Sequence, residues 1–151
     1  MSILLALHLL AAVVWVGGMF FAYMALRPAA GGLAPRERLE LWQRVFDRFL
    51  YWVWAAVVLL LVTGYWMVLG PLGGFEGLGL HIQIMHGLGW VMVLLFLHLF
   101  FVPYRGLRAA LAAGDEPMAA RHLARIRIIV VTNLTLGLIV VAVAGGGRYV
   151  G

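Results

Sequence analysis

The sequence contains no cysteine and no lysine, and only six of its 151 residues are acidic. Without cysteine the chain cannot form disulfide bonds, zinc–thiolate sites, iron–sulfur clusters or a copper relay built on thiolates. Charged residues make up 11% of the sequence, whereas a soluble domain of this size is about a quarter charged. This scarcity of charge, together with a hydrophobic content of 65%, predicts a protein that lies in the lipid bilayer.

Four apolar stretches are long enough to cross a bilayer, which takes roughly 20 residues of helix. They cover approximately residues 3–26, 50–69, 81–102 and 126–144, and they leave little of the chain for a soluble domain. We therefore expect residues 1–151 to form one integral membrane domain, an all-α bundle of four transmembrane helices. The first stretch has no basic segment before it and is too long for the apolar part of a signal peptide, so we expect it to be retained.

All eleven basic residues are arginines, and their positions predict an orientation. Residues 70–80, between the second and third stretches, include no arginine, whereas the other two connections are rich in it. The positive-inside rule places those two connections in the cytoplasm and both termini outside (N-out/C-out). They also account for the net charge of +5, which therefore predicts no nucleic-acid partner. The arginines of the two connections are Arg27, Arg36, Arg38, Arg44, Arg48, Arg105, Arg108, Arg121, Arg125 and Arg127.

The first connection has the pattern of an amphipathic helix. Between residues 34 and 49, Leu39, Trp42 and Phe46 follow helical spacing, and arginines fill the other face. Pro35 suits the first helical turn. We expect a helix on the cytoplasmic membrane surface that runs into the second span; a solvated helical connector is the alternative.

Three histidines lie within the predicted spans: His8, His86 and His98. An ionisable side chain at membrane depth is costly and commonly marks a functional site, and histidine is a frequent ligand of metals and of haem iron. His8 and His86 both lie about 8 Å below the predicted outer boundary. Two imidazoles at one depth suit a bis-histidine haem b site. His98 follows His86 by twelve residues, so it lies about 18 Å deeper and is turned by about 120°.

The neighbours of these histidines also fit a cofactor slot. Trp15 shares a helical stripe with His8, and Trp90 lies one turn from His86. The glycines beside them leave room for a planar group, although they also suit close helix packing alone. Asn133 in the fourth span is expected to face the bundle, where it either supports a helix contact or touches a cofactor. His81 lies at the membrane boundary, as a metal ligand or only as a boundary residue.

Copper is the alternative to haem. Histidine and methionine together suit Cu(I). In this hypothesis His81, His86 and His8 accept copper from the outer side, and His98 with Met24 forms an inner relay. The methionines do not form a Met-x-x-Met pair, and scattered methionines are also common as core filler.

The run from Leu7 to Met19, with His8 and Trp15-Val16-Gly17-Gly18, resembles the first helix of the copper-resistance D (CopD) family. The run Leu61-Val62-Thr63-Gly64 and a third helix that holds His86 and His98 before a basic loop fit the same family, so the likeness covers nearly the whole chain. The resemblance implies a short, stand-alone relative of longer members that couple such a domain to copper uptake across the bacterial inner (plasma) membrane.

The same pattern is similar to the HemJ-type protoporphyrinogen oxidases, which are small four-helix membrane proteins that bind haem b and form oligomers. In that family the first-helix histidine, matched here by His8, is tied to haem binding, and His86 and His98 match two further histidines approximately. The lysine of the family's third-helix motif has no counterpart here, and its Asn-Glu-x-Pro motif is met only at Asn133. The resemblance therefore implies the scaffold and the haem site rather than the oxidase activity.

From these patterns we expect a b-type haem protein of the bacterial inner membrane, with His8 and His86 as axial ligands. It would transfer electrons or oxidise a membrane-soluble partner, a quinol or a porphyrinogen. The sequence assigns no catalytic residue. Copper transport or tolerance is the alternative function, and an assembly subunit of a larger membrane complex is a third. The glycine-rich helix faces favour a homodimer.

Overall fold

The computed structural model describes residues 2–147, which are helical apart from short connections and contain no strand. The prediction of an all-α protein with four long apolar helices is confirmed. Each predicted span lies inside one continuous helical segment: Ser2–Ala30, Pro35–Leu69, Leu80–Ala112 or Glu116–Gly146. The elements are α1 (Ser2–Phe21), η1 (Ala22–Leu26), α2 (Arg27–Ala30), α3 (Pro35–Leu69), α4 (Leu80–Leu99), η2 (Phe100–Tyr104), α5 (Arg105–Ala112) and α6 (Glu116–Gly146).

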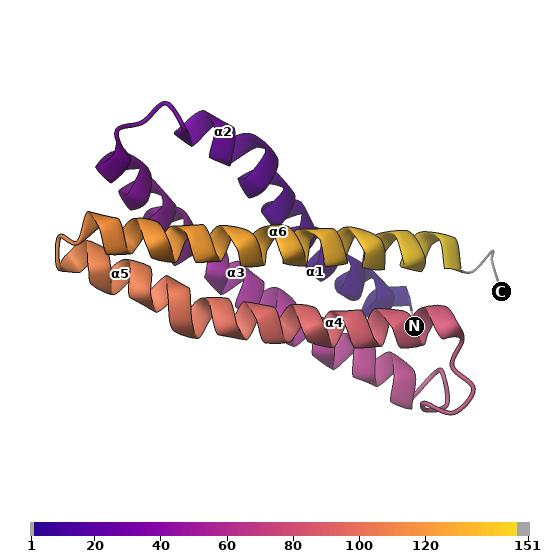
Figure 1. The fold of residues 1–151 in the computed structure, drawn as a ribbon. Helices are drawn as coiled ribbons and strands as arrows, with labels where there is room; N and C mark the ends of the chain where they lie inside the picture. Colours follow the sequence, from indigo (N-terminus) through magenta and orange to yellow (C-terminus); the bar gives the residue numbers. More distant parts are fainter. Residues whose placement is uncertain (1, 148–151) are drawn as a thin grey trace.

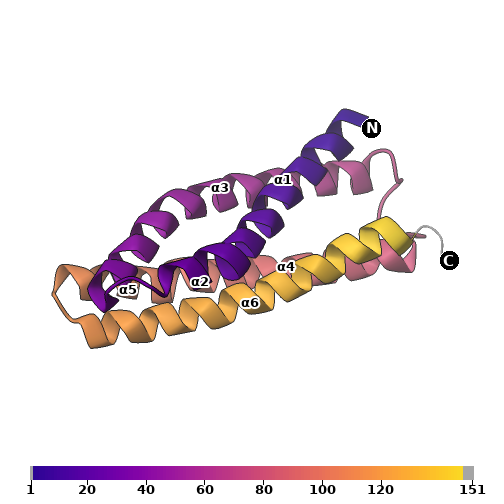
Figure 2. The ribbon, with the colours of Figure 1, turned by 90° about the horizontal axis from the view of Figure 1, so that it is seen from above.

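The helices form two layers, and each layer is one helical hairpin (Figures 1 and 2). Helix α1 packs mainly on α3, and α4 packs mainly on α6. Helices α2 and α5 and the beginnings of α3 and α6 lie together, and we call this the arginine-rich end. The beginning of α1, the 70–79 loop and the last turns of α6 lie at the opposite end. The hairpins thus meet with their basic connections side by side.

The outer surface of the bundle is apolar. Large side chains such as Val13, Trp52 and Leu94 are at least 60% exposed. Only Thr63 and Asn133 are buried polar residues within the described part of the chain, each 2% exposed. An apolar exterior that no protein layer covers suits lipid rather than water. The chain is therefore a multi-pass membrane protein.

Two segments of π-helix interrupt the long helices at the arginine-rich end. Segment η1 lies between α1 and α2 and is followed by Pro28, and η2 between α4 and α5 contains Pro103. Proline has no backbone N–H, and its ring displaces the carbonyl of the preceding turn. A π segment absorbs such a change by hydrogen bonding from i to i+5, and such segments are frequent at functional sites.

The junction between α5 and α6 contains Gly114-Asp115-Glu116-Pro117, a sequence typical of a helix break. Gly114 has φ of +72°, a conformation that favours glycine. Asp115 caps α6, since its carboxylate accepts a hydrogen bond from the Met118 backbone N–H at 3.0 Å. Pro117 lies in the first helical turn, where its missing N–H costs nothing.

We expect Asp115→Ala to lower the free energy of unfolding by about 1 kcal/mol, because the amide of Met118 loses its acceptor. The measurement is the denaturant midpoint of the purified protein in neutral detergent. Glu76→Ala, in the loop at the opposite end, is the control. Equal midpoints for the Asp115 variant and the unmodified protein would contradict the capping role.

The expected amphipathic helix is the first part of α3 and, as expected, runs into the second span. Its apolar residues Leu39, Trp42 and Phe46 are buried within the bundle. The amphipathic pattern therefore reflects the packing of this part of α3 between the two hairpins. At the same end, Asp47 of α3 accepts a hydrogen bond from the Tyr104 hydroxyl and lies 3.7 Å from Arg108, which ties α3 to the second hairpin.

Candidate functional site

His8 belongs to α1, and its ring lies against α3. Its Nδ1 is 2.8 Å from the hydroxyl oxygen of Thr63. Its Cε1 is 3.3 Å from the place that a Cβ would take on Gly64. His8 is half-buried. Gly64 thus leaves room for the imidazole, and Thr63 holds it by one ring nitrogen.

Thr63 decides which nitrogen of His8 carries the proton. The Thr63 hydroxyl donates to the Leu59 carbonyl oxygen at 2.6 Å, so its lone pair accepts the hydrogen bond from Nδ1–H of His8. In this neutral imidazole Nε2 keeps its lone pair. A protein partner on one ring nitrogen and a metal on the other is the usual arrangement of a metal-ligating histidine.

His86 contacts a different face of α3. Its ring packs edge-on against Tyr65 and Phe75, with ring centroids 5.5 Å apart in both pairs. Tyr65 and Thr63 are two residues apart, so they point about 200° apart around the helix. The rings of His8 and His86 therefore lie on opposite sides of α3. Trp90 joins the same aromatic group, since its indole N–H donates to the Tyr65 hydroxyl at 3.0 Å.

His98 and His81 lie apart from this group. His98 is exposed on the outside of α4. His81 is half-buried, and its Cβ is only 2.6 Å from where a Cβ would lie on Gly147 at the end of α6. Within residues 2–147, histidine and carboxylate side chains do not gather in groups of three or more that would hold a metal ion.

These positions bear directly on a haem held between His8 and His86. A flat cofactor needs its two axial ligands to face each other, whereas α3 separates these rings within one chain. The residues present in a single chain therefore do not fit that group. The ligand pair stays a prediction, and we derive no chemistry from it.

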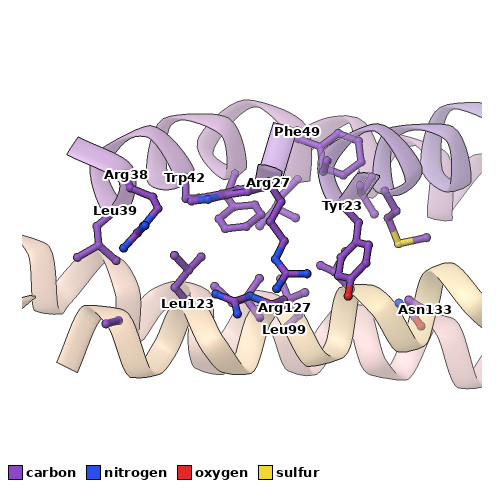
Figure 3. A pocket seen from close by; sticks show the side chains of 18 of the residues that line it. Tyr23, Arg27, Arg38, Leu39, Trp42, Phe49, Leu99, Leu123, Arg127 and Asn133 are labelled. Carbon is purple, nitrogen blue, oxygen red and sulfur yellow. The ribbon is translucent and has the colours of Figure 1, made fainter. Parts of the chain in front are cut away.

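A cavity of about 610 Å³ lies between the two hairpins in their arginine-rich half (Figure 3). Its apolar walls include Trp42, Phe46 and Phe49 of α3, and Trp15 of α1. Trp15 is 4% exposed and packs edge-on against Phe96, with ring centroids 6.1 Å apart. Trp15 thus borders a cavity large enough for a ligand, but none of its described lining residues is a histidine.

Three arginines, Arg27, Arg38 and Arg127, line this cavity. Figure 3 shows their guanidinium groups pointing into the space between the two helix layers. The arginines that form ion pairs within residues 2–147 are Arg36, Arg44 and Arg108. The pairs are Arg36–Glu40, Arg36–Glu116, Arg44–Glu40 and Arg108–Asp47. The three cavity arginines have no carboxylate partner among the described residues.

Asn133 is the second unusual polar group of the cavity. Its side-chain amide donates to the Met92 carbonyl oxygen at 3.1 Å, which joins α6 to α4. Its Oδ1 is buried and has no hydrogen-bond partner among the described residues, and the residue lines the cavity. The expected helix contact of Asn133 is therefore present, and its contact with a cofactor stays a prediction.

The arginine cluster was not predicted, because all three residues were assigned to solvated connections. Trp15, Met19 and Tyr23 recur every fourth residue of the first helix, and Arg27 continues the series. All four line the cavity, but twelve residues of unbroken α-helix would turn Arg27 about 120° away from Trp15, so the sequence spacing alone did not place Arg27 on this face; the π segment η1 does.

One comparison with known proteins gave a match. The family model described as copper resistance protein D matches residues 43–146, which is more than half of the chain. The chain belongs to the CopD family. A search of curated proteins and a search of solved structures gave no match.

The CopD match covers α4 with His81, His86 and His98, and α6 with Asn133. It begins within α3 and leaves out α1, so His8 and Trp15 are linked to the family only by the sequence resemblance. The match agrees with a copper-resistance-related membrane protein. The likeness to HemJ-type oxidases stays a prediction.

Proposed function

We propose that this CopD-family chain handles copper in the bacterial inner membrane, as part of copper transport or copper tolerance. The observation that carries the proposal is His8, whose Nδ1 is held by Thr63 at 2.8 Å so that Nε2 can bind a metal ion. The family match supports copper as that ion. In this proposal copper is the cargo.

The ligand chemistry of the outer half suits Cu(I). Neutral imidazole and thioether groups bind this soft ion well. Met67 lies one turn after Thr63 on the same face of α3 and is 9% exposed, so it offers a sulfur near the face that receives His8. Isolated ligands also suit transit, because a transported ion must bind strongly enough to enter and weakly enough to leave.

The orientation in this proposal is N-out/C-out, with the arginine-rich end in the cytoplasm. His81, His86 and His8 then lie in the outer half, where copper would enter, and His98 and Met24 lie nearer the cytoplasm. His98 and Met24 are both exposed on the single chain. A homodimer would give such groups a partner from the second copy.

The test is Cu(I) binding by the purified protein, measured by competition with a coloured Cu(I) chelator. We expect saturable binding that His8→Ala weakens about tenfold or more, since a ligand is removed. His122→Gln changes a histidine outside the proposed set and is the matched control. Equal loss in both variants, or no binding by the unmodified protein, would contradict the proposal.

A reduced-minus-oxidised optical spectrum of the same sample decides between copper and the earlier haem hypothesis. A b-type α-band that disappears in His8→Ala and in His86→Ala would reinstate haem b. Haem-free protein that binds Cu(I) favours copper. In cells, deletion of the gene is expected to change copper content or tolerance.

A further inference from the structure

The cavity between the hairpins plays no part in the copper proposal, because its described lining includes no histidine. It has three features that need a common explanation. One end carries three guanidinium groups, the walls are apolar and aromatic, and the deep end has a buried amide oxygen without a partner. From these features we propose that the cavity binds an amphipathic organic anion.

The guanidinium groups of Arg27, Arg38 and Arg127 specify the anionic part. They point into one space that apolar side chains border, so an anionic group that enters this space meets three positive groups. Glu116 is the acid that lines the cavity, but its carboxylate lies 3.6 Å from Arg36. A carboxylate or phosphate group bound here gains charge-assisted hydrogen bonds from planar donors that match its geometry.

The walls specify the apolar part. Trp42 and Phe46 form a stacked pair with ring centroids 5.3 Å apart, and both line the cavity. Phe49, Leu50 and Val53 extend the same wall along α3. Such a surface favours a hydrocarbon or ring body over a small inorganic ion, because apolar contact contributes in proportion to the area removed from water.

Asn133 indicates which group of the ligand lies at the deep end of the cavity. Asn133 is 2% exposed, and its Oδ1 accepts no hydrogen bond from the described part of the chain. A buried acceptor left without a donor is destabilising. Arg127 and Asn133 are six residues apart on α6, or about 9 Å along the axis. The anion that fits has, besides its charged group, a hydroxyl or N–H group that reaches Asn133 at the other end of the cavity.

The test uses 10-hydroxydecanoate, with decanoate lacking the donor and decanol lacking the charge. Binding is measured by titration of the full chain in phosphatidylcholine nanodiscs. The cavity variant is Arg38→Gln/Arg127→Gln. The control is Arg121→Gln/Arg125→Gln, which removes the same charge from residues of α6 that are exposed and do not line the cavity.

We expect the cavity variant to bind 10-hydroxydecanoate about tenfold more weakly or worse, as loss of charge-assisted hydrogen bonds predicts, and the control to stay within about twofold. We also expect 10-hydroxydecanoate to bind more tightly than decanoate, and Asn133→Leu to abolish that difference. If the double variant does not fold, the same titration is carried out with the single Arg127→Gln variant, because Arg127 is exposed.

Two results would overturn the proposal: equal weakening in the cavity and control variants, or decanol binding as tightly as decanoate. Addition of phosphatidylglycerol to the nanodiscs identifies the source of the anion. Displacement of 10-hydroxydecanoate by this lipid points to an acidic lipid of the same leaflet, and persistence of binding points to a diffusible acid. The copper affinity is expected to be unchanged in the cavity variant.

Discussion

Thr63→Val is expected to lower the affinity for Cu(I) by about ten- to hundredfold, the usual effect of removing the group that orients a metal-ligating histidine. Valine keeps the shape of threonine but cannot accept the hydrogen bond from Nδ1–H of His8, which spans 2.8 Å. The imidazole then loses both its fixed tautomer and its orientation. The measurement is the same chelator competition as for His8→Ala.

Thr63→Ser is the matched control, because serine keeps the hydroxyl. It should retain most of the affinity. Nitrogen-15 NMR of the His8 ring supplies a readout that does not depend on copper: Nδ1 should carry the proton in the unmodified protein and in Thr63→Ser, and the tautomers should mix in Thr63→Val. Unchanged affinity in Thr63→Val would show that Thr63 does not position His8.

The neighbouring glycines Gly17 and Gly18 are expected to respond in opposite ways to the same substitution. A Cβ on Gly18 would clash with the ring of Phe49, whereas a Cβ on Gly17 meets nothing within 4 Å. We expect Gly18→Leu to lower the free energy of unfolding by about 1–3 kcal/mol or more through overpacking. Gly17→Leu should be neutral or slightly stabilising, because leucine favours helix over glycine.

The denaturant midpoints of the two variants in detergent test this contrast. Phe49→Ala in the Gly18→Leu background should recover part of the loss, because the smaller side chain makes room. Equal destabilisation by the two glycine substitutions would mean that lipid-facing effects, and not the contact with Phe49, control the result.

The fold was predictable because hydropathy and helix length alone define the four spans. The breaker at Gly114 and Asp115 was predictable because its turn chemistry is local. The pairing of side chains across helices was not, because it depends on how each helix is rotated about its axis. His8 and His86 share a depth, but only the packing of α1 on α3 places His8 against Thr63.

The candidate site was therefore predicted in its parts and not as a whole. His8, Trp15 and Asn133 were named from their cost or size in a membrane span. The positive-inside rule already accounted for Arg27, Arg38 and Arg127, so these arginines gave no separate indication of a cavity. An arginine that fits the positive-inside rule can thus also line a cavity, and the rule does not distinguish the two cases.

The π segment η1 also determines how this protein tolerates changes in length. Arg27 follows Trp15 by twelve residues, so an unbroken α-helix would turn it about 120° away from that residue. The wider turns of Ala22–Leu26 rotate less per residue and return Arg27 to the cavity side. Removing one residue from this segment would restore ordinary helix and leave Arg27 eleven residues after Trp15, which is a turn of only about 20°, so Arg27 would stay on the cavity side. A one-residue gap at this point in a family alignment would therefore preserve the face on which Arg27 lies, whereas a gap elsewhere in α1 would turn the residues on its two sides by about 100° relative to each other.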